Sequence, residues 1–257
     1  MLNIGRYGRF ANAAFQCLAV LGIAKKNNLE PVFLPFTNHD HRDRFGSTED
    51  VDLQKYFVHQ LPPIPEGISW QPERGYGWGY QDIVVPPGNW NIAGHFQSKK
   101  YWQNCTDQAS HYFRMIGEGP IEDVCSIHVR LQDYDGGYHP RLDMRYYEPA
   151  MAQFPHSKFL VFSDDIPEAK RMFGDRVEYS EGLDYIGDFR RLKRCRDFIV
   201  GNSSYSALAA LLNDSAGRVV APRPWFGRKY TEIDGEDIYD YGWTVVNYET
   251  GEITTKT

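Results

Sequence analysis

The sequence predicts an α/β protein with a parallel β-sheet in its second half. Short apolar runs alternate there with stretches of helical periodicity, which is the pattern of a sheet covered by helices on both faces. The chain has 257 residues, of which 42% are hydrophobic and 15% aromatic, and this composition is ample for a packed core. Such a length fits one large domain or two small ones.

The first half is predicted to begin as strand, helix and strand. Apolar residues recur at helical spacing behind the first strand, and Lys25 and Lys26 close that helix. Residues 37–90 are rich in proline, glycine and aromatic residues, so we expect irregular structure with a single helix. The predicted order is a strand at 2–7, a helix at 10–27, a strand at 31–36, a helix at 50–58, a strand at 91–96 and a helix at 99–115.

The second half alternates regularly between strands and helices. The predicted strands are 126–131, 158–163, 176–179, 198–200 and 218–221, and the predicted helices are 145–154, 166–173, 184–194 and 205–213. The glycine-rich GEGP segment that starts at Gly117 is the best boundary between the halves. We therefore expect domains at 1–117 and 118–226, followed by a tail at 227–257 with a β-hairpin that turns near Gly251.

Charge and composition exclude several classes of protein. The net charge of −6 argues against binding along a nucleic-acid backbone. No apolar run approaches the roughly 18 residues of a membrane span, and the polar N-terminus does not resemble a signal peptide. We therefore expect a soluble, cytoplasmic protein. The cysteines Cys17, Cys105, Cys125 and Cys195 are widely spaced and are expected to be reduced core thiols.

The segment DFIVGNSSYS at 197–206 contains the clearest candidate for an anion site. A buried strand there ends at a glycine, and Asn202, Ser203 and Ser204 stand where the next helix begins. Hydroxyl groups and free backbone N–H groups at a helix N-terminus suit a phosphate. Ordinary capping of the helix explains the same residues without a ligand.

Two further strand ends are predicted to lie at the same sheet edge. His128 and Arg130 are two residues apart and therefore share one face of their strand. A guanidinium group on an inward face needs a partner, which is either an anionic ligand such as a diphosphate or a carboxylate, Asp133 or Asp164. Asp164 ends the next strand, where it is placed to accept from a nucleoside, or else it or Asp165 caps the following helix.

A third polar cluster precedes the first helix. The segment GRFAN at 8–12 combines a glycine turn with Arg9 and Asn12 at a helix start, and this arrangement suits a phosphate or a sugar. A glycine turn with a capping residue explains it nearly as well.

Six segments in order resemble the motifs of the α-1,2-fucosyltransferases. The matching segments are GRFANAAFQ from Gly8, GHFQSKKYW from Gly94, HVRLQD from His128, FSDD from Phe162, CRDFIVGNSSYS from Cys195 and VAPRPWF from Val220. The resemblance spans roughly residues 5–226. It implies a GT-B-like fold of two Rossmann-like halves, and an inverting, metal-independent transfer of fucose from GDP-fucose to a galactoside, with no further cofactor.

The resemblance also implies roles for individual residues. The half at 1–117 would bind the acceptor, and the half at 118–226 would bind the nucleotide sugar. Arg130 would bind the donor diphosphate, Ser203 and Ser204 with Asn202 would add phosphate or ribose contacts, and Asp164 would contact the nucleoside. Arg9 and Asn12 would line the cleft from the N-terminal side. Leu131 replaces the second arginine of the family motif and is expected to point away from the face that carries Arg130.

The transfer requires a base and an acceptor site. Asp133 and His128 are the candidate bases, and Asp133 is preferred because a carboxylate is already deprotonated at neutral pH. The acceptor is expected to be a saccharide, for instance a surface glycan, because residues 69–102 are rich in aromatic side chains that suit sugar C–H surfaces. His95 and Gln97 are the candidate polar contacts within that stretch.

Two alternative functions remain open from the sequence. Asp133 and Asp135 form a DxD pattern, which would hold a divalent ion in a metal-dependent transferase of the GT-A type. The replacement of a motif arginine by Leu131 would also suit a nucleotide- or sugar-binding module that has lost catalysis.

Overall fold

The structure is a computed structural model that describes residues 1–4, 8–35, 53–132, 134, 137–230, 233 and 235–257. The chain divides into two compact units, Met1–Gly117 and Glu118–Thr257. The division falls within the GEGP segment at which the sequence analysis placed its boundary.

Unit 1 (Met1–Gly117) contains a three-stranded parallel sheet and one long buried helix. The sheet order is β1-β3-β2, with β1 at Leu2–Ile4, β2 at Gln71–Gly75 and β3 at Trp90–Ala93. The helix α1 (Phe10–Lys26) is buried over nearly all of its length because alanine and large apolar residues occupy every side of it. The shorter helical segments are η1 (Leu53–Tyr56), η2 (Lys99–Tyr101), η3 (Gln103–Cys105) and α2 (Thr106–Tyr112).

Several predicted elements of unit 1 are shorter than expected. In the described part of the predicted strand at 31–36 there are only isolated bridges, at Pro31 and Phe33, because proline has no N–H group to donate to a ladder. The predicted helix at 99–115 is divided into η2, η3 and α2. Of the helix predicted at 50–58, only the short η1 lies within the described residues. The strand β2 was not predicted, because it is exposed at every position and so has no alternation of apolar residues.

Unit 2 (Glu118–Thr257) is built on a seven-stranded sheet in the order β10-β9-β8-β7-β4-β5-β6. Every pair of neighbours is parallel except β9 and β10, which form the antiparallel hairpin predicted for the tail. The hairpin extends the sheet of unit 2 because β9 pairs with β8. The strands are β4 (Glu122–Val129), β5 (Phe159–Ser163), β6 (Glu178–Tyr179), β7 (Cys195–Ile199), β8 (Val219–Arg223), β9 (Thr244–Asn247) and β10 (Ile253–Thr255).

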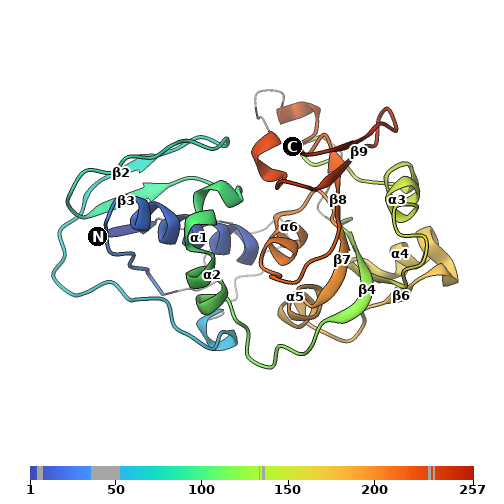
Figure 1. The fold of residues 1–257 in the computed structure, drawn as a ribbon, viewed down its shortest axis with the longest axis horizontal. Helices are drawn as coiled ribbons and strands as arrows, with labels where there is room; N and C mark the ends of the chain where they lie inside the picture. The colour runs from blue at the N-terminus through green and yellow to red at the C-terminus, as the bar shows by residue number, and fades with distance from the viewer. Residues whose placement is uncertain (5–7, 36–52, 133, 135–136, 231–232, 234) are drawn as a thin grey trace. The chain divides into compact units, whose positions relative to one another are not determined.

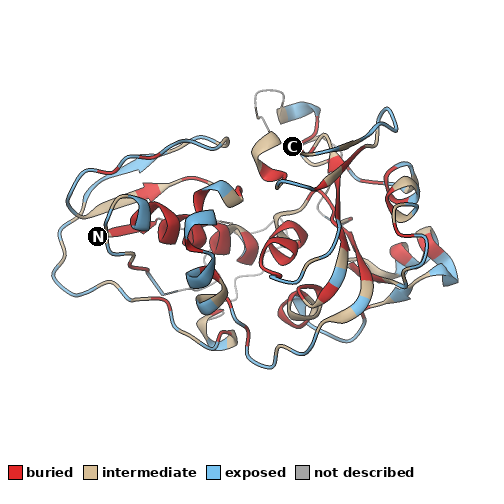
Figure 2. Cartoon of the chain, in the orientation of Figure 1, coloured by how far each residue is buried: buried red, intermediate tan, exposed pale blue. Residues whose placement is uncertain are grey.

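Helices cover both faces of this sheet, as Figure 1 shows. On one face α3 (Met144–Met151) and α4 (Ile166–Phe173) pack on a cluster of alternate strand residues that includes Ile127, Val161 and Ile199. On the other face lie α5 (Tyr185–Leu192) and α6 (Ser204–Leu211). In Figure 2 the strands and the sheet-facing sides of these helices are predominantly buried. The predicted α/β class with a mostly parallel sheet is therefore confirmed.

The predicted strand at 176–179 is only the two-residue β6. A short η4 segment (Gly174–Arg176) occupies its first part, and Gly174 has a positive φ of 60°, which ends α4. The other strands and helices of unit 2 lie within a few residues of their predicted positions. The cysteines are free and buried, as expected. Within the described parts of the chain, no helix combines the length and the apolar character needed to cross a bilayer.

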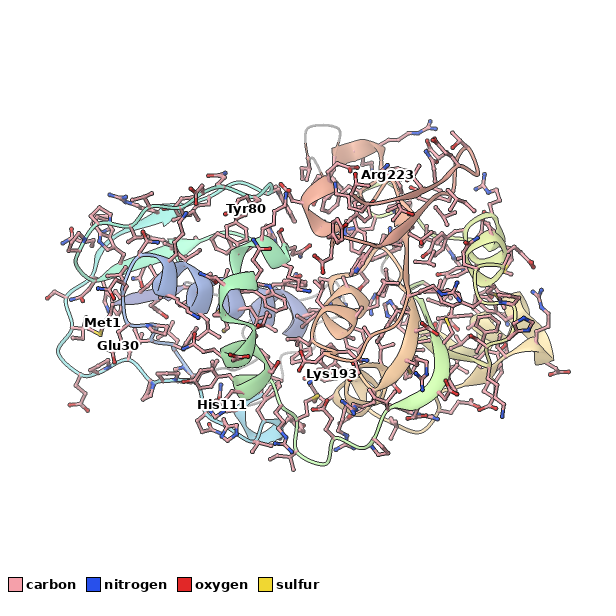
Figure 3. All side chains as sticks on the ribbon, viewed as in Figure 1. Met1, Glu30, Tyr80, His111, Lys193 and Arg223 are labelled. Carbon is pink, nitrogen blue, oxygen red and sulfur yellow. The ribbon has the colours of Figure 1, made fainter. Side chains whose placement is uncertain are left out.

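A buried ion pair fixes the first residue of unit 2. Lys193, at the C-terminal end of α5 (labelled in Figure 3), lies 3.0 Å from a carboxylate oxygen of Glu118, and Arg194 lies 3.5 Å from the same atom. The Glu118 and Lys193 side chains are only 10% and 6% exposed. The two cations neutralise the charge of the buried carboxylate and hold the start of unit 2 against the end of α5.

One tyrosine of α3 holds the carboxyl end of β7 beside β8. The Tyr146 hydroxyl donates to the carbonyl oxygen of Val200 at 2.6 Å and lies 3.1 Å from that of Val220. Its side chain is completely buried. Because Val200 directly precedes the Gly201–Ser203 turn, this contact connects the packing of α3 to the sheet edge at which the polar motifs lie.

Removing this hydroxyl is expected to destabilise unit 2. Tyr146→Phe leaves two buried carbonyl groups without a side-chain donor, which should lower the free energy of unfolding by about 1–2 kcal/mol. Urea denaturation measures the change. In the matched variant Tyr179→Phe, which removes an exposed bond to Gly174, the loss should stay below about 0.5 kcal/mol. Equal losses in the two variants would contradict the role given to Tyr146.

Candidate functional site

The polar motifs of unit 2 meet at the carboxyl edge of its parallel sheet. Arg130 directly follows β4, Asp164 directly follows β5, and Ser203 lies between β7 and α6. In the sheet order, β4 lies between β5 and β7, so these three residues come from adjacent strands. This edge is where open α/β sheets bind their ligands.

Asp164 holds the turn that carries Arg130. One of its carboxylate oxygens accepts from the backbone N–H of Leu131 at 2.9 Å, and the other accepts from that of Gln132 at 3.2 Å. The second oxygen also lies 3.2 Å from Nε of Arg130. The ion pair that the sequence left open is therefore formed with Asp164. Arg130 keeps 23% of its side chain exposed, so the guanidinium group is oriented by protein and still reaches solvent.

Gln132 completes this turn, and the sequence analysis did not identify it as a site residue. Its amide Nε2 donates to the carbonyl oxygen of Asp164 at 2.6 Å, so Asp164 accepts hydrogen bonds from this turn through both its carboxylate and its backbone carbonyl. The available signal in the sequence was its position two residues after Arg130, from which its side chain reaches the end of the neighbouring strand β5.

His128 is buried on the same strand face as Arg130. Its ring stacks on Tyr205 of α6 with the centroids 5.4 Å apart, and its backbone carbonyl accepts from the Tyr147 hydroxyl. Among the described residues, no group forms a hydrogen bond with its Nδ1 atom. Burial, together with the nearby Arg130 charge, lowers the pKa of His128 to about 3, so the ring is neutral at physiological pH.

Tyr205 is a second residue that the sequence analysis missed. Besides the stacking on His128, its ring packs edge-on against Phe189 of α5, and its hydroxyl donates to the carbonyl of Tyr185. It thus ties α5 and α6 to the strand that carries Arg130. The family motif gives no indication of this role, because the contact joins residues that are far apart in sequence.

The serine motif forms a capped helix start, as the simpler of its two interpretations requires. Oγ of Ser203 accepts from the N–H of Tyr205 at the first turn of α6, and Ser204 is the first residue of that helix. The Asn202 amide donates to the carbonyl of Pro140 at 2.9 Å, and its own carbonyl accepts from the Tyr134 hydroxyl. Asn202 is buried, whereas Ser203 and Ser204 are partly exposed at the sheet edge.

Asp133 and Asp135 lie outside the described residues, so the structure places neither the preferred base nor the DxD pair. Among the residues that are described, no three histidine, cysteine, aspartate or glutamate side chains group closely enough to hold a metal ion. Of the two predicted bases, His128 is a weak proton acceptor with a pKa of about 3.

The predicted residues of unit 1 form their own cluster. Nε2 of the buried Gln97 donates a hydrogen bond to Oδ1 of Asn12 at 2.7 Å. Asn12, which was predicted to contact the nucleotide sugar, and Gln97, which was predicted to contact the saccharide acceptor, are therefore bonded to each other. Gly8 has a positive φ of 90° and its Cα lies against the Asn12 side chain, where a Cβ would be 2.6 Å from Nδ2. Arg9 is the exposed N-cap of α1, and His95 stacks on Trp78 with ring centroids 3.6 Å apart.

Leu131 lies where the alternation of the strand places it. Its side chain is 4% exposed and belongs to the core cluster beneath α3 and α4, on the face opposite to His128. The predicted orientation away from Arg130 is confirmed. A leucine at this position adds apolar packing and leaves the Arg130 side of the strand unchanged.

A family model and a curated relative both indicate a glycosyltransferase. The family model described as "Glycosyl transferase family 11" matches residues 103–247. An O-antigen biosynthesis glycosyltransferase of Escherichia coli, WbnK, is 30% identical over 162 residues, which are 57% of this chain and 50% of that protein. The chain thus spans about half the length of the curated relative that it matches.

Solved structures show a similar fold. The NodZ α-1,6-fucosyltransferase soaked with GDP-fucose is similar with a TM-score of 0.52 and 11% identity, covering 87% of this chain and 95% of that one. The NodZ fucosyltransferase from Bradyrhizobium has a TM-score of 0.50 and 12% identity, covering 85% of this chain and 94% of that one. Both are of the GT-B type, which confirms the predicted fold class.

The buried imidazole of His128 should make stability depend on pH. Because its folded pKa of about 3 lies below the ordinary value of 6.5, the unfolded chain takes up a proton that the folded chain refuses as the pH falls below about 6.5. The free energy of unfolding should therefore decrease between pH 6.5 and 3. The variant His128→Phe keeps an aromatic ring that can stack on Tyr205 but has no group that takes up a proton.

Urea denaturation of the wild type and His128→Phe at pH 7 and pH 5 measures this contribution. When the pH is lowered from 7 to 5, the free energy of unfolding of the variant should rise by about 2 kcal/mol relative to that of the wild type. As a control, the difference in free energy of unfolding between the two proteins should stay constant between pH 7 and pH 8. Parallel curves down to pH 5 would show that His128 is protonated in the folded protein.

Proposed function

The chain belongs to glycosyl transferase family 11, and we propose that it transfers fucose from GDP-fucose to a hydroxyl group of a saccharide. The proposed reaction is inverting, of the α-1,2 type, and proceeds without a metal ion. The family assignment supports a glycosyltransferase in general, and the site geometry supports the choice of a diphosphate donor. The NodZ α-1,6-fucosyltransferase, which has a similar fold, was soaked with GDP-fucose, and this supports fucose as the sugar.

The observation that carries the proposal is the oriented guanidinium of Arg130. Nε faces the carboxylate of Asp164 at 3.2 Å, while the side chain stays partly exposed at the carboxyl edge of the sheet. In the proposal, the Nη atoms bind the oxygens of the donor diphosphate as a planar fork. Ser203, Ser204 and the N–H groups at the start of α6 add neutral donors beside it.

These groups stabilise the leaving group in the proposed reaction. The oxygen of the acceptor hydroxyl attacks the anomeric carbon from the side opposite to the diphosphate and forms the new C–O bond. The bond between that carbon and the diphosphate breaks, and its electron pair stays on the diphosphate oxygen, where Arg130 offsets the developing charge. The hydroxyl proton passes to a base, for which we propose Asp133 because a neutral His128 with a pKa of about 3 is the poorer acceptor.

The remaining predicted residues have positioning roles in this proposal. Asp164 holds Arg130 through Oδ2 and the turn after it through both oxygens, and Oδ1, which accepts from the N–H of Leu131, has a second lone pair for the donor nucleoside. Asn202 fixes the loop before α6 through its bond to Pro140. Arg9 and Asn12 contribute to donor binding from unit 1, and His95 and Gln97 contact the acceptor.

Calorimetric titration with GDP, UDP and CMP, first in EDTA and then with Mn²⁺, tests the donor assignment. We expect GDP to bind in EDTA, and we expect GDP-fucose to be consumed when a saccharide acceptor array is added. Binding of UDP only with Mn²⁺ would instead point to a metal held by Asp133 and Asp135. GDP binding without turnover on any acceptor would favour a degenerate binding module.

Arg130→Ala should weaken GDP binding about tenfold or more and lower kcat/KM for GDP-fucose by about 10²–10³-fold, because the diphosphate loses its charged donor. Arg130→Lys, which keeps the charge but not the planar fork, should fall between this variant and the wild type. Arg196→Ala, which removes an exposed arginine of β7 paired with Asp123, is the matched control and should leave both values unchanged. Full activity in Arg130→Ala would overturn the assignment.

A further inference from the structure

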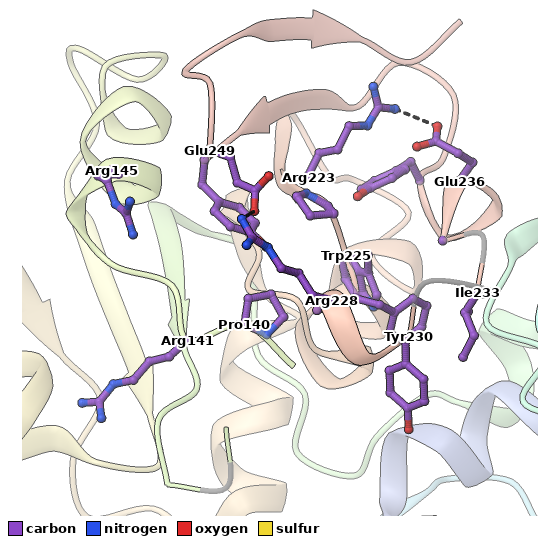
Figure 4. Close-up of a pocket in the computed structure, with 16 residues that line it drawn as sticks. Pro140, Arg141, Arg145, Arg223, Trp225, Arg228, Tyr230, Ile233, Glu236 and Glu249 are labelled. Atoms are coloured by element: carbon purple, nitrogen blue, oxygen red, sulfur yellow. Dashed lines mark hydrogen bonds and ion pairs between the residues drawn. The ribbon is translucent and has the colours of Figure 1, made fainter. Parts of the chain in front are cut away.

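Unit 2 contains a cavity that none of the proposed donor residues lines. Its volume is about 540 Å³, and the residues around it come from the loops that follow β8 and β9 and from the segment that leads into α3 (Figure 4). This volume is within the range of about 300–1,000 Å³ that small-molecule sites occupy. The cavity lies at the carboxyl ends of β8 and β9, along the same sheet edge as Arg130.

The cavity has a positively charged lining, although the chain as a whole is acidic. Four arginines and two glutamates line it. Arg145 on α3 and Arg228 after β8 point toward one another from opposite walls in Figure 4. Arg223 instead pairs with Glu236, which also lines the cavity, and Arg141 pairs with Glu168. Arg145 and Arg228 are thus the two lining arginines that face one another.

These two arginines keep hydrogen-bonding capacity. Arg228 is 92% exposed, and its contact with Glu249, at 3.6 Å, is longer than a hydrogen bond. Arg145 is 75% exposed and pairs with Asp143 through Nε and one Nη atom. Ion pairs between exposed side chains contribute little energy, so a ligand anion can compete with these carboxylates.

The charges of both arginines affect the pKa of one residue, Tyr248. Burial, followed by the charge of Glu249, raises the pKa of Tyr248 to about 12, while Arg228 and Arg145 act in the opposite direction. Tyr248 lines the cavity. Arg145, Arg228 and Tyr248 thus all line the same cavity.

The other walls suit the body of a sugar. Trp225, Phe226 and Tyr230 present aromatic surface, which packs on sugar C–H groups. The carboxylate of Glu236 can accept hydrogen bonds from hydroxyl groups. Cations at one side, aromatic rings and hydroxyl acceptors together match a saccharide that carries one anionic group.

We propose that this cavity binds an acidic saccharide, a sugar bearing a carboxylate or a phosphate, with the anionic group between Arg145 and Arg228. The inference rests on the proposed function, since it makes this sugar a part of the acceptor glycan. The cavity is connected to the donor residues through one loop, because the Asn202 amide donates to the carbonyl of Pro140, which lines the cavity. An acidic sugar bound there would therefore lie beside the serine motif.

Saturation-transfer NMR titrations with galacturonate, galactose 6-phosphate and galactose test the proposal and separate a carboxylate from a phosphate. The two acidic sugars, or one of them, should bind more tightly than neutral galactose. In Arg145→Gln/Arg228→Gln the acidic sugar should lose about tenfold or more in affinity. Both side chains are exposed, so this variant should fold normally. Arg176→Gln, which alters an exposed arginine paired with Glu148 away from the cavity, is the matched control.

Glu249→Gln is a variant of opposite sign. Because it removes a carboxylate that competes for Arg228, it should strengthen binding of the acidic sugar. Equal binding of galactose and both acidic sugars, or full affinity in Arg145→Gln/Arg228→Gln, would overturn the proposal.

A parallel GDP titration separates this proposal from the donor assignment. If GDP binding is unchanged in Arg145→Gln/Arg228→Gln while the acidic sugar is lost, the cavity is a saccharide site distinct from the donor site. A loss of GDP binding in that variant would make the cavity part of the donor site and overturn the proposal. If the wild type binds the acidic sugar through these arginines but does not bind GDP, the proposed function fails and the saccharide site stands.

Discussion

The carboxylate of Asp164 is the constraint on which the candidate site depends. It receives the backbone N–H groups of Leu131 and Gln132 and faces Nε of Arg130, so it sets both the path of the chain after β4 and the orientation of the guanidinium group. A long flexible cation becomes a directed donor in this way, and its orientation is established before any ligand arrives. The side-chain amide of Gln132 donates a further hydrogen bond to the backbone carbonyl of Asp164, which fixes the turn more firmly to the end of β5.

The alternating side chains of β4 place candidate site residues on one face of the strand and core residues on the other. His128 and Arg130 lie on the face covered by α6, whereas Ile127, Val129 and Leu131 lie in the core cluster under α3 and α4. Buried contacts on both faces hold the strand in one register, because a shift by one residue would place Arg130 in the apolar core. The replacement of a motif arginine by Leu131 is therefore tolerated by the fold, and it lies on the face that does not carry the candidate diphosphate contact.

Much of the local structure followed from sequence pattern, and the misses have identifiable causes. Strands and helices of unit 2 were predicted closely, since apolar runs and capping residues such as Asp165 and Asp184 are local signals. The exposed strand β2 was missed because none of its side chains is buried, and the predicted strand at 31–36 was limited to bridges because prolines interrupt it. Tyr205, Gln132 and the cavity arginines were missed because their contacts join distant segments.

By itself, the sequence determined the α/β class, the boundary near Gly117, and the residues Arg130, Asp164 and Ser203 as candidates, because periodicity and short motifs are properties of neighbouring residues. Only the tertiary structure decided that Asp164 pairs with Arg130, that His128 is buried and neutral, and that Arg145 and Arg228 line one cavity. The physical reason is that ion pairing, desolvation and cavity shape depend on the distance between segments in space, which the order of strands in the sheet sets.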